Sequence, residues 1–153
     1  MKANAGLTRL EINSPTVSES QIDLYYRHHV HHAEQKAWPH PGSKRLSNHF
    51  DMITDNCYPT QEWDFFRDDK LIGVCYIDEL SDGLSGVYFY YDPDYKHLSP
   101  GTWMCLSMIE RAQALNLPYV YLGYLVRGCR SMEYKANFKP FELLGQDNIW
   151  RKA

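Results

Sequence analysis

The sequence contains no apolar run close to the ~20 residues that a helix needs to cross a bilayer, so an integral membrane protein is not expected. Its first residues, MKANAGLTRLEIN, have neither an apolar core nor a cleavage signature, which predicts a cytoplasmic protein without an export signal. An excess of one charge is also missing, because 16 basic and 19 acidic residues give a net charge of −3. We therefore expect neither a membrane nor DNA as a partner.

Cysteine is scarce, and no two cysteines form a CxxC pair, which argues against a structural zinc ribbon. The four are expected to be reduced thiols, with Cys75 in the core: Cys57, Cys75, Cys105 and Cys129. Histidine is concentrated in YRHHVHHAE, where His28 and His32 share one helix face at a spacing that can hold a metal. Because no third ligand is apparent, we predict no metal, and a polar helix face or a substrate contact instead.

Aromatic residues are abundant among the 153 residues: 12 Tyr, 6 Phe and 4 Trp. The length and the 44% hydrophobic content predict a single domain over residues 1–153, with residues 1–14 flexible. A helix should begin near Thr16 or Ser18, where Ser18 and Gln21 can form a capping box. Its predicted inward face consists of Ile22, Tyr25, Tyr26, His29, Val30 and Ala33. Residues 38–45, WPHPGSKR, are predicted to be a loop.

Strand patterns follow from residue 62. EWDFFR and KLIGVCYID flank Asp68-Asp69 and predict a hairpin, and residues 85–93 predict a third strand ended by a proline. Ser99-Pro100 marks the start of a helix, and PYVYLGYL predicts a fourth strand over 118–125. This helix should bury Cys105, Met108, Ile109, Ala112 and Leu115. The order predicts an α+β fold with a mixed, mainly antiparallel sheet flanked by helices.

Charge is uneven along the chain. Residues 51–94 carry 11 acidic and 2 basic side chains, whereas residues 125–140 carry four basic and one acidic. The basic segment could hold a phosphate or a carboxylate, or could simply be a solvated edge.

Two segments resemble a known family: DGLSGVYFYYDPDYKHLSPGT (82–102) and YVYLGYLVRGCRSMEYKANFKPFELL (119–144). They are similar to the C-terminal catalytic domain of the aminoacyl-tRNA–protein transferases, which include arginyltransferases and the bacterial aspartate/glutamate leucyltransferases. The resemblance covers roughly residues 20–145. It implies a GNAT-like fold and an aminoacyltransferase that joins a tRNA-borne amino acid, Arg or Leu, to the amino group of a protein, peptide or small molecule. Protein arginylation and N-degron marking are implied in turn.

The resemblance implies that no cofactor is used. The sequence supports this independently, because LSPGT lacks the glycine-rich loop that acetyltransferases offer to a pyrophosphate. Aminolysis of an ester needs aligned substrates and hydrogen-bond donors for the developing oxyanion. Tyrosines at strand ends can supply such donors, although most are expected to belong to the core. By alternation, Tyr88 and Tyr90 should share one face of their strand.

Candidate site residues follow from these arguments. Asp92 could accept a hydrogen bond from the attacking amine or could equally be an Asx-turn acceptor. The catalytic candidates are Tyr90, Asp92, Tyr121 and Tyr124. The substrate-binding candidates are His32, which matches a family histidine, Tyr88, Gly123, Arg127, Cys129, Arg130, Tyr134 and Lys135; of these, the basic side chains suit phosphate or carboxylate.

Two alternatives stay open. The family's cysteine-rich N-terminal domain has no counterpart here, and Ser131 stands where the family has a lysine. Both departures favour a non-catalytic module that binds acidic N-termini or charged tRNA. An acyl-CoA N-acyltransferase is disfavoured by the missing pyrophosphate loop.

Overall fold

The computed structural model describes residues 9–36, 39–42, 49–51, 53 and 58–153. They belong to two compact units, Met1–Tyr121 and Leu122–Ala153. The single domain predicted for residues 1–153 stays a prediction, since two units of this kind can belong to one domain. Residues 38 and 43–45 of the predicted loop over 38–45, and Cys57, lie outside the described residues; residues 39–42 are described and form neither helix nor strand, as expected for a loop.

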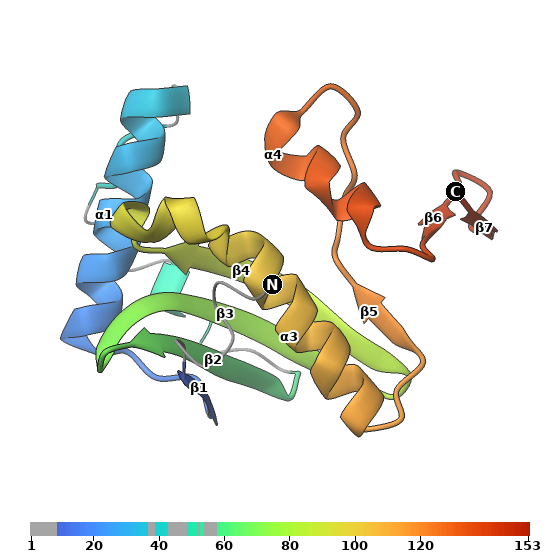
Figure 1. The fold of residues 1–153 in the computed structure, drawn as a ribbon, viewed down its shortest axis with the longest axis horizontal. Coiled ribbons are helices and arrows are strands. Elements are labelled where there is room, and N and C mark those ends of the chain that lie inside the picture. The colour runs from blue at the N-terminus through green and yellow to red at the C-terminus, as the bar shows by residue number, and fades with distance from the viewer. Residues whose placement is uncertain (1–8, 37–38, 43–48, 52, 54–57) are drawn as a thin grey trace. The chain divides into compact units, whose positions relative to one another are not determined.

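The N-terminal unit contains a five-stranded sheet in the order β1-β2-β3-β4-β5 (Figure 1). Strands β1 to β4 pair antiparallel and β5 pairs parallel with β4, which confirms the predicted mixed, mainly antiparallel sheet. The strands are β1 Arg9–Asn13, β2 Thr60–Arg67, β3 Lys70–Leu80, β4 Gly83–Tyr91 and β5 Tyr119–Tyr121.

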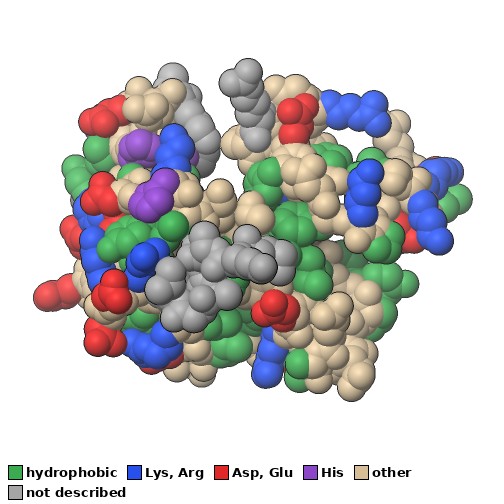
Figure 2. All heavy atoms as spheres, viewed as in Figure 1, with side chains coloured by type: hydrophobic (Ala, Val, Ile, Leu, Met, Phe, Trp, Pro, Cys, Tyr) green, Lys and Arg blue, Asp and Glu red, His purple; other side chains and the backbone are tan. Residues whose placement is uncertain are grey.

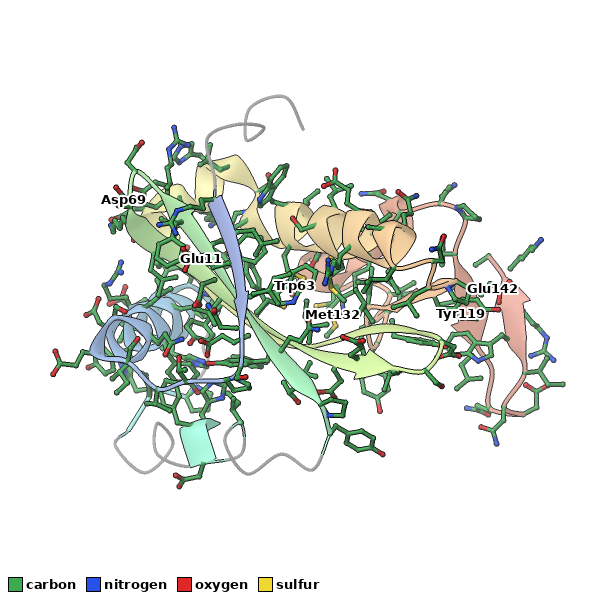
Figure 3. All side chains as sticks on the ribbon, turned by 90° about the horizontal axis from the view of Figure 1, so that it is seen from below. Glu11, Trp63, Asp69, Tyr119, Met132 and Glu142 are labelled. Atoms are coloured by element: carbon green, nitrogen blue, oxygen red, sulfur yellow. The ribbon has the colours of Figure 1, made fainter. Side chains whose placement is uncertain are left out.

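Two long helices lie on opposite faces of this sheet (Figure 3). Helix α1, Glu19–Lys36, packs on one face, and α3, Pro100–Ala114, packs on the other; the short helix η1, Pro93–Leu98, precedes α3. The predicted capping box is present, because Ser18 N donates to Gln21 Oε1 at 2.8 Å and Gln21 N donates to Ser18 Oγ at 3.3 Å. Among the described residues, neither helix is long and apolar enough to span a membrane.

The predicted β2–β3 hairpin is correct. Asp68 and Asp69 both have positive φ, 49° and 59°, which is the geometry of a two-residue hairpin turn. Helix α3 starts at Pro100 as predicted and buries Cys105, Met108 and Ala112. Leu115 was expected on the same inward face, but it follows the last helical residue and is 37% exposed.

Three expectations about the first and last strands and α1 are wrong. Residues 9–13 were placed in a flexible end, but they form β1, because their backbone pairs with the edge of β2. The fourth strand ends at Tyr121 instead of residue 125, since Gly123 adopts φ +72°, which a strand cannot accommodate. Tyr26 is 49% exposed, whereas His28 and His32 are buried, so these histidines do not form a polar outer face.

The space between α1 and the sheet holds a polar layer as well as an apolar core. Glu62 on β2 is fully buried and accepts hydrogen bonds from Thr16, at 3.1 Å from the backbone N and 2.8 Å from Oγ1. Asp64 lies two residues further along the same face of β2 and is 8% exposed. Burial, and then the charge of Glu62, raise the pKa of Asp64 to about 6.

The C-terminal unit consists of short elements that the sequence did not predict. They are α4 Arg130–Glu133, η2 Tyr134–Asn137, β6 Glu142–Leu144 and β7 Trp150–Lys152, and the two strands pair antiparallel.

Replacing Asp64 with asparagine should stabilise the fold at neutral pH. Because the pKa of Asp64 is raised in the folded state, ionisation of this carboxyl lowers the free energy of unfolding as the pH rises from about 4 to 6. Asparagine keeps an acceptor oxygen and does not ionise. We expect Asp64→Asn to raise the free energy of unfolding by roughly 1–3 kcal/mol at about pH 7.5 and to leave it nearly unchanged at about pH 4, measured by urea titration.

The control is Glu34→Gln, which removes an exposed acid from α1 and should change stability little at either pH. Equal stability of Asp64→Asn and the parent protein at about pH 7.5 would contradict the raised pKa.

Candidate functional site

The strands β4 and β5 separate early, which exposes the middle of β4. They pair only at Gly83, Leu84 and Ser85. Beyond Ser85, no strand in the described part of the chain pairs with this edge of β4. On the other edge, the register with β3 shifts, so Val87 is an extra residue that forms a bulge. A bulge beside an open edge is a common setting for a binding site, because backbone groups there are available to a ligand.

Tyr88 follows this bulge and lies against α1. As predicted, Tyr88 and Tyr90 share one face, with ring centroids 6.2 Å apart. The hydroxyl of half-buried Tyr88 lies 2.7 Å from Nε2 of His29, a histidine that is 1% exposed. The ring of His49 lies 4.8 Å from that of Tyr88 and stacks on Tyr25 at 4.3 Å.

Tyr90, a predicted catalytic residue, lies in the core. It is fully buried, its hydroxyl is 3.3 Å from that of Tyr76, and burial raises its pKa. This is the core role that the sequence left open for most of the tyrosines. A catalytic role for Tyr90 stays a prediction, but no part of its side chain reaches solvent in this structure.

Asp92, at the end of β4, is fully buried and bonded on both oxygens. Its Oδ1 lies 2.8 Å from Arg27 Nη1 and its Oδ2 lies 2.8 Å from Lys70 Nζ. The backbone N of Asp94 donates to Oδ1 at 3.1 Å, so Asp92 caps η1 as an Asx-turn acceptor. Burial alone would raise the pKa of Asp92, but the hydrogen bonds from Lys70 and Arg27 outweigh it and hold the pKa below its usual range.

His32, predicted to bind substrate, lies in a buried group of histidines next to Tyr91. Its ring centroid is 4.4 Å from that of His28, and Nδ1 of His28 lies 3.1 Å from the Tyr91 carbonyl oxygen and 3.2 Å from its backbone N. Burial, and then the charge of His32, lower the pKa of His28 to about 3, so His28 is neutral at physiological pH. Within the described ranges, no three His, Cys, Asp or Glu side chains are placed to hold a metal ion.

Tyr121 lies at the opposite end of β4 from Asp92. It is the register partner of Ser85, and its hydroxyl donates to Asp82 Oδ2 at 3.0 Å. Seven residues of strand separate Ser85 from Asp92, about 23 Å at ~3.3 Å per residue. The two predicted catalytic residues therefore cannot contact the same reacting atoms.

In the C-terminal unit, Lys135 holds a loop together. Its Nζ donates to the carbonyl oxygens of Leu122, at 2.6 Å, and Tyr124, at 3.0 Å, around the positive φ of Gly123. These bonds occupy the ammonium group that the sequence assigned to an anion. They leave the Tyr124 side chain 85% exposed, where a ligand can reach it.

Arg127 is exposed beside a cavity of about 420 Å³ whose lining also includes Leu125, Glu133 and Phe141. Glu133 Oε1 accepts from the backbone N of Gly128 at 2.8 Å. The unit carries six basic and three acidic residues, and Figure 2 shows Lys and Arg side chains spread over its surface. This excess of positive charge suits an anionic ligand.

Two of the remaining candidates of this unit, Cys129 and Tyr134, make contacts within its local structure. Cys129 Sγ lies 3.2 Å from Ser131 Oγ, and the Cys129 carbonyl accepts from the backbone at the start of α4. Tyr134 packs edge-on against Phe138, with ring centroids 6.4 Å apart. Arg130 begins α4, and its side chain lies outside the described part of the structure.

The sequence did not identify three residues that contact candidate site residues: His29, which bonds to Tyr88, and Arg27 and Lys70, which pair with Asp92. The helical pattern correctly placed His29 inward, but it could not reveal Tyr88 as its partner. Arg27 and Lys70 lie far from Asp92 in the sequence, and nothing in their local patterns marks them as its ion-pair partners.

Known proteins of similar sequence identify the family of this chain. The family model described as "Arginine-tRNA-protein transferase, C terminus" matches residues 20–145. An aspartate/glutamate leucyltransferase of Campylobacter jejuni is 35% identical over 138 residues, which cover 90% of this chain and 57% of the relative. Another, of Alkalilimnicola ehrlichii, is 38% identical over 149 residues, which cover 94% and 59%. The chain thus spans a little over half the length of these relatives.

Solved structures show the fold. A possible acetyltransferase from Clostridium difficile superimposes with a TM-score of 0.60 at 10% identity, covering 84% of this chain and 87% of that one. A GNAT-family acetyltransferase from Staphylococcus aureus gives a TM-score of 0.59 at 14% identity, covering 92% and 89%. The expected GNAT-like fold is therefore confirmed. With this fold and the family match over residues 20–145, the chain belongs to the arginine-tRNA-protein transferase C-terminal family.

Proposed function

We propose that this chain transfers an amino acid, Arg or Leu, from aminoacyl-tRNA to the amino group of an acceptor protein, peptide or small amine. The observation that carries the proposal is the family match over residues 20–145, together with homologues named aspartate/glutamate leucyltransferase. Those names point to acidic N-termini as acceptors. On this proposal the protein acts in the cytoplasm, where aminoacyl-tRNA is made, and marks N-degrons by leucylation or protein arginylation.

The reaction asks little covalent chemistry of the protein. The acceptor's α-amino group attacks the ester carbonyl, a peptide bond forms, and the ribose hydroxyl of the tRNA leaves with the amine's proton. The protein must align two substrates and offer donors to the oxyanion. Tyr88 beside the open edge of β4, and the exposed Tyr124, are the phenols best placed to contact substrates. The Tyr121 hydroxyl donates a hydrogen bond to Asp82, just before β4. On this proposal Tyr121 would contact a substrate at that end of the strand.

The basic side chains of the C-terminal unit would receive the anionic partner. Arg127 is the most available of the described candidates, because Lys135 is bonded to two carbonyls. Cys129, Tyr134, Gly123 and Gly128 would shape this surface. Asp92 would act as a positioning residue, since its buried carboxylate is held by Arg27 and Lys70.

Acyl-CoA transfer is the second candidate, because the solved structures of similar fold are acetyltransferases. The start of α3 argues against it. Pro100 occupies the first helical position and has no N–H group, so it removes one of the backbone donors that a helix N-terminus offers to a pyrophosphate.

The direct test is an incubation of the purified 153-residue chain with charged total tRNA and peptides that begin with Asp, Glu, Arg or Lys. A parallel reaction contains acetyl-CoA in place of tRNA. We expect mass spectrometry to show a leucyl or arginyl addition to the Asp and Glu peptides that requires charged tRNA. Acetylation in the parallel reaction would support the second candidate, and tight binding of tRNA or peptide without any addition would support a non-catalytic module.

Arg127→Ala should weaken binding of the anionic partner. A charge-assisted hydrogen bond contributes about 1.5–3 kcal/mol, so we expect at least a tenfold loss of affinity, measured by fluorescence anisotropy at one fixed salt concentration. The assay is run with charged tRNA and with an acidic peptide, and the ligand affected identifies which anion Arg127 receives. Lys152→Ala, which removes an exposed cation from β7 in the same unit, is the control. Equal affinities of Arg127→Ala and the parent for both ligands would show that Arg127 is only a solvated surface residue.

Asp92→Asn should affect stability more than turnover. Asparagine can still cap η1, but Arg27 and Lys70 lose their ion pairs with the carboxylate. Because both cations are partly exposed, water can solvate them in the variant, which limits the loss of stability. We expect the free energy of unfolding to fall by about 1.5–3 kcal/mol, while kcat of the folded enzyme changes by less than about tenfold. Asp94→Asn, at the exposed neighbour, is the control. A hundredfold loss of kcat with unchanged stability would instead indicate that Asp92 contacts the amine.

A further inference from the structure

The C-terminal unit contains a cavity of about 420 Å³. Its lining includes Leu125, Arg127, Glu133, Ala136, Phe141 and Leu143. These residues come from the loop before α4, from α4 and η2, and from β6 and the residue just before it. All of these segments belong to one compact unit, Leu122–Ala153, so this unit builds the cavity from its own residues.

The lining combines apolar walls with two charged side chains. The four apolar residues named above are half-buried, whereas Arg127 and Glu133 are exposed. The cavity is therefore open to solvent beside the two charges. A volume between roughly 300 and 1,000 Å³, apolar walls and a few polar groups are the usual features of a small-ligand site. The cavity has both the size and the lining of a binding site.

Glu133 is held in place by the loop beside it. Its Oε1 accepts from the backbone N of Gly128 at 2.8 Å, and Gly128 adopts φ +80°, which favours glycine. An ionised carboxylate has about four acceptor sites on its two oxygens, so one bond does not exhaust the acceptor capacity of Glu133. The guanidinium of Arg127 offers several donors and a positive charge. The cavity therefore suits a ligand that brings hydrogen-bond donors to Glu133 and an anion to Arg127.

Three parts of the proposed substrates could enter such a cavity. An acidic N-terminus brings an ammonium and a carboxylate, but it has no apolar group for the walls. An aminoacyl ester brings an ammonium but no anion, and leucine offers only four side-chain carbons to a cavity of this size. A nucleotide from the single-stranded end of tRNA brings a flat base for the walls, an exocyclic amine for Glu133 and a phosphate for Arg127. The nucleotide matches all of these features of the cavity.

The base that suits Glu133 is one with an exocyclic amino group. Adenine presents an N6 amine and cytosine an N4 amine, whereas guanine and uracil present carbonyl oxygens at the corresponding positions. A carboxylate accepts hydrogen bonds from the first two bases and repels the oxygens of the others. Every tRNA ends in the single-stranded sequence CCA, which contains only cytosine and adenine. The acceptor chemistry of Glu133 therefore fits each nucleotide of this end.

We propose that the cavity of the C-terminal unit binds a base of the CCA end of tRNA. Glu133 accepts from the exocyclic amine, Arg127 binds a phosphate beside the base, and Phe141 and the aliphatic residues pack against the base. This inference rests on the proposed aminoacyl transfer. It assigns the donor tRNA, rather than the acidic acceptor, to this unit, and it gives Glu133 a role in substrate binding.

Filling the cavity should weaken binding of this end of tRNA. The probe is an uncharged RNA hairpin with a single-stranded CCA 3′ end, so that binding is measured without any transfer. We expect Ala136→Phe to lower its affinity about 5- to 100-fold, the range for loss of one stacked base, by fluorescence anisotropy at one fixed salt concentration. Ala114→Phe, the same change at an exposed alanine of α3, is the matched control. A folded Ala136→Phe variant with the parent's affinity overturns the proposal.

Exchanging the bases tests the role of Glu133. A second hairpin ends in UUG, which replaces each exocyclic amine with a carbonyl oxygen. We expect the parent to bind the CCA hairpin about tenfold more tightly, and Glu133→Gln, whose amide both donates and accepts, to reduce this preference below about threefold. Glu142→Gln, on β6 of the same unit, should keep the parent's preference. Equal affinities of the parent for both hairpins, or an unchanged preference in Glu133→Gln, contradict the proposal.

Methyl NMR spectra of the parent protein locate the ligand without any substitution, so the proposal remains testable if a variant fails to fold. The CCA hairpin should shift the methyl signals of Leu125 and Leu143, with the buried Leu24 of α1 as the reference. A hairpin that binds without shifting these two signals overturns the proposal, as does a shift caused only by a peptide that begins with Asp. An equally tight complex with 5′-AMP would assign the cavity to a free nucleotide and contradict the role of tRNA.

Failure of this inference can be told from failure of the proposed function. Transfer from charged tRNA, with the Leu125 and Leu143 signals unaltered by the hairpin, would keep the function and overturn the assignment of the cavity. Binding of the CCA hairpin in the cavity, with no transfer from any charged tRNA, would instead contradict the proposed aminoacyl transfer.

Discussion

The buried carboxylate of Asp92 connects the elements around the candidate site in the N-terminal unit. It binds Arg27 of α1 and Lys70 at the start of β3, and it caps η1, while its backbone N donates to Ile72 on β3 at 2.8 Å. Three elements that are distant in sequence thus meet at one side chain. Because Arg27 lies two residues before His29, the ion pair also fixes the part of α1 that faces Tyr88. A buried charge is stable only when its partners are in place, so this carboxylate selects one arrangement of α1 on the sheet.

The buried layer between α1 and β4 is unusually polar for a protein core. Histidines and tyrosines occupy positions where aliphatic side chains would pack with less cost of desolvation. Their hydrogen bonds offset part of that cost, as between His29 and Tyr88 or between His28 and the backbone of Tyr91. Such a layer fixes the direction of polar groups as well as their position. The apolar part of the core packs α1 against β3 and β4 beside this polar layer.

Local patterns in the sequence predicted the local structure well. Asp68-Asp69 predicted the hairpin, Ser18 and Gln21 predicted the start of α1, and Ser99-Pro100 predicted the start of α3. Local patterns could not predict the pairing of strands that are distant in sequence. Strand β1, for example, depends on an edge of β2 that lies about fifty residues later. The same limit applies to the site. The alternation of Tyr88 and Tyr90 was predictable, whereas the histidine beneath Tyr88 and the cations on Asp92 depend on how α1 docks. The strand β5 was predicted, but its early end was not, because one positive φ, at Gly123, outweighs the strand propensity of its neighbours.

The chemistry of the proposed reaction explains why neutral groups suit this site. An α-ammonium must lose a proton before it attacks, and a cation nearby would favour the neutral amine but would also repel the substrate on entry. A carboxylate would attract the ammonium but would hold it in the protonated, unreactive state. A phenol oxygen that accepts one hydrogen bond does neither, because it orients the nitrogen without changing its charge. On this argument the buried carboxylates of β2 and the ion pairs of Asp92 have to lie away from the open edge of β4. In the structure Glu62 is bonded to Thr16, just before α1, Asp64 is hydrogen-bonded to Gln21 of α1, and Asp92 is neutralised by two cations.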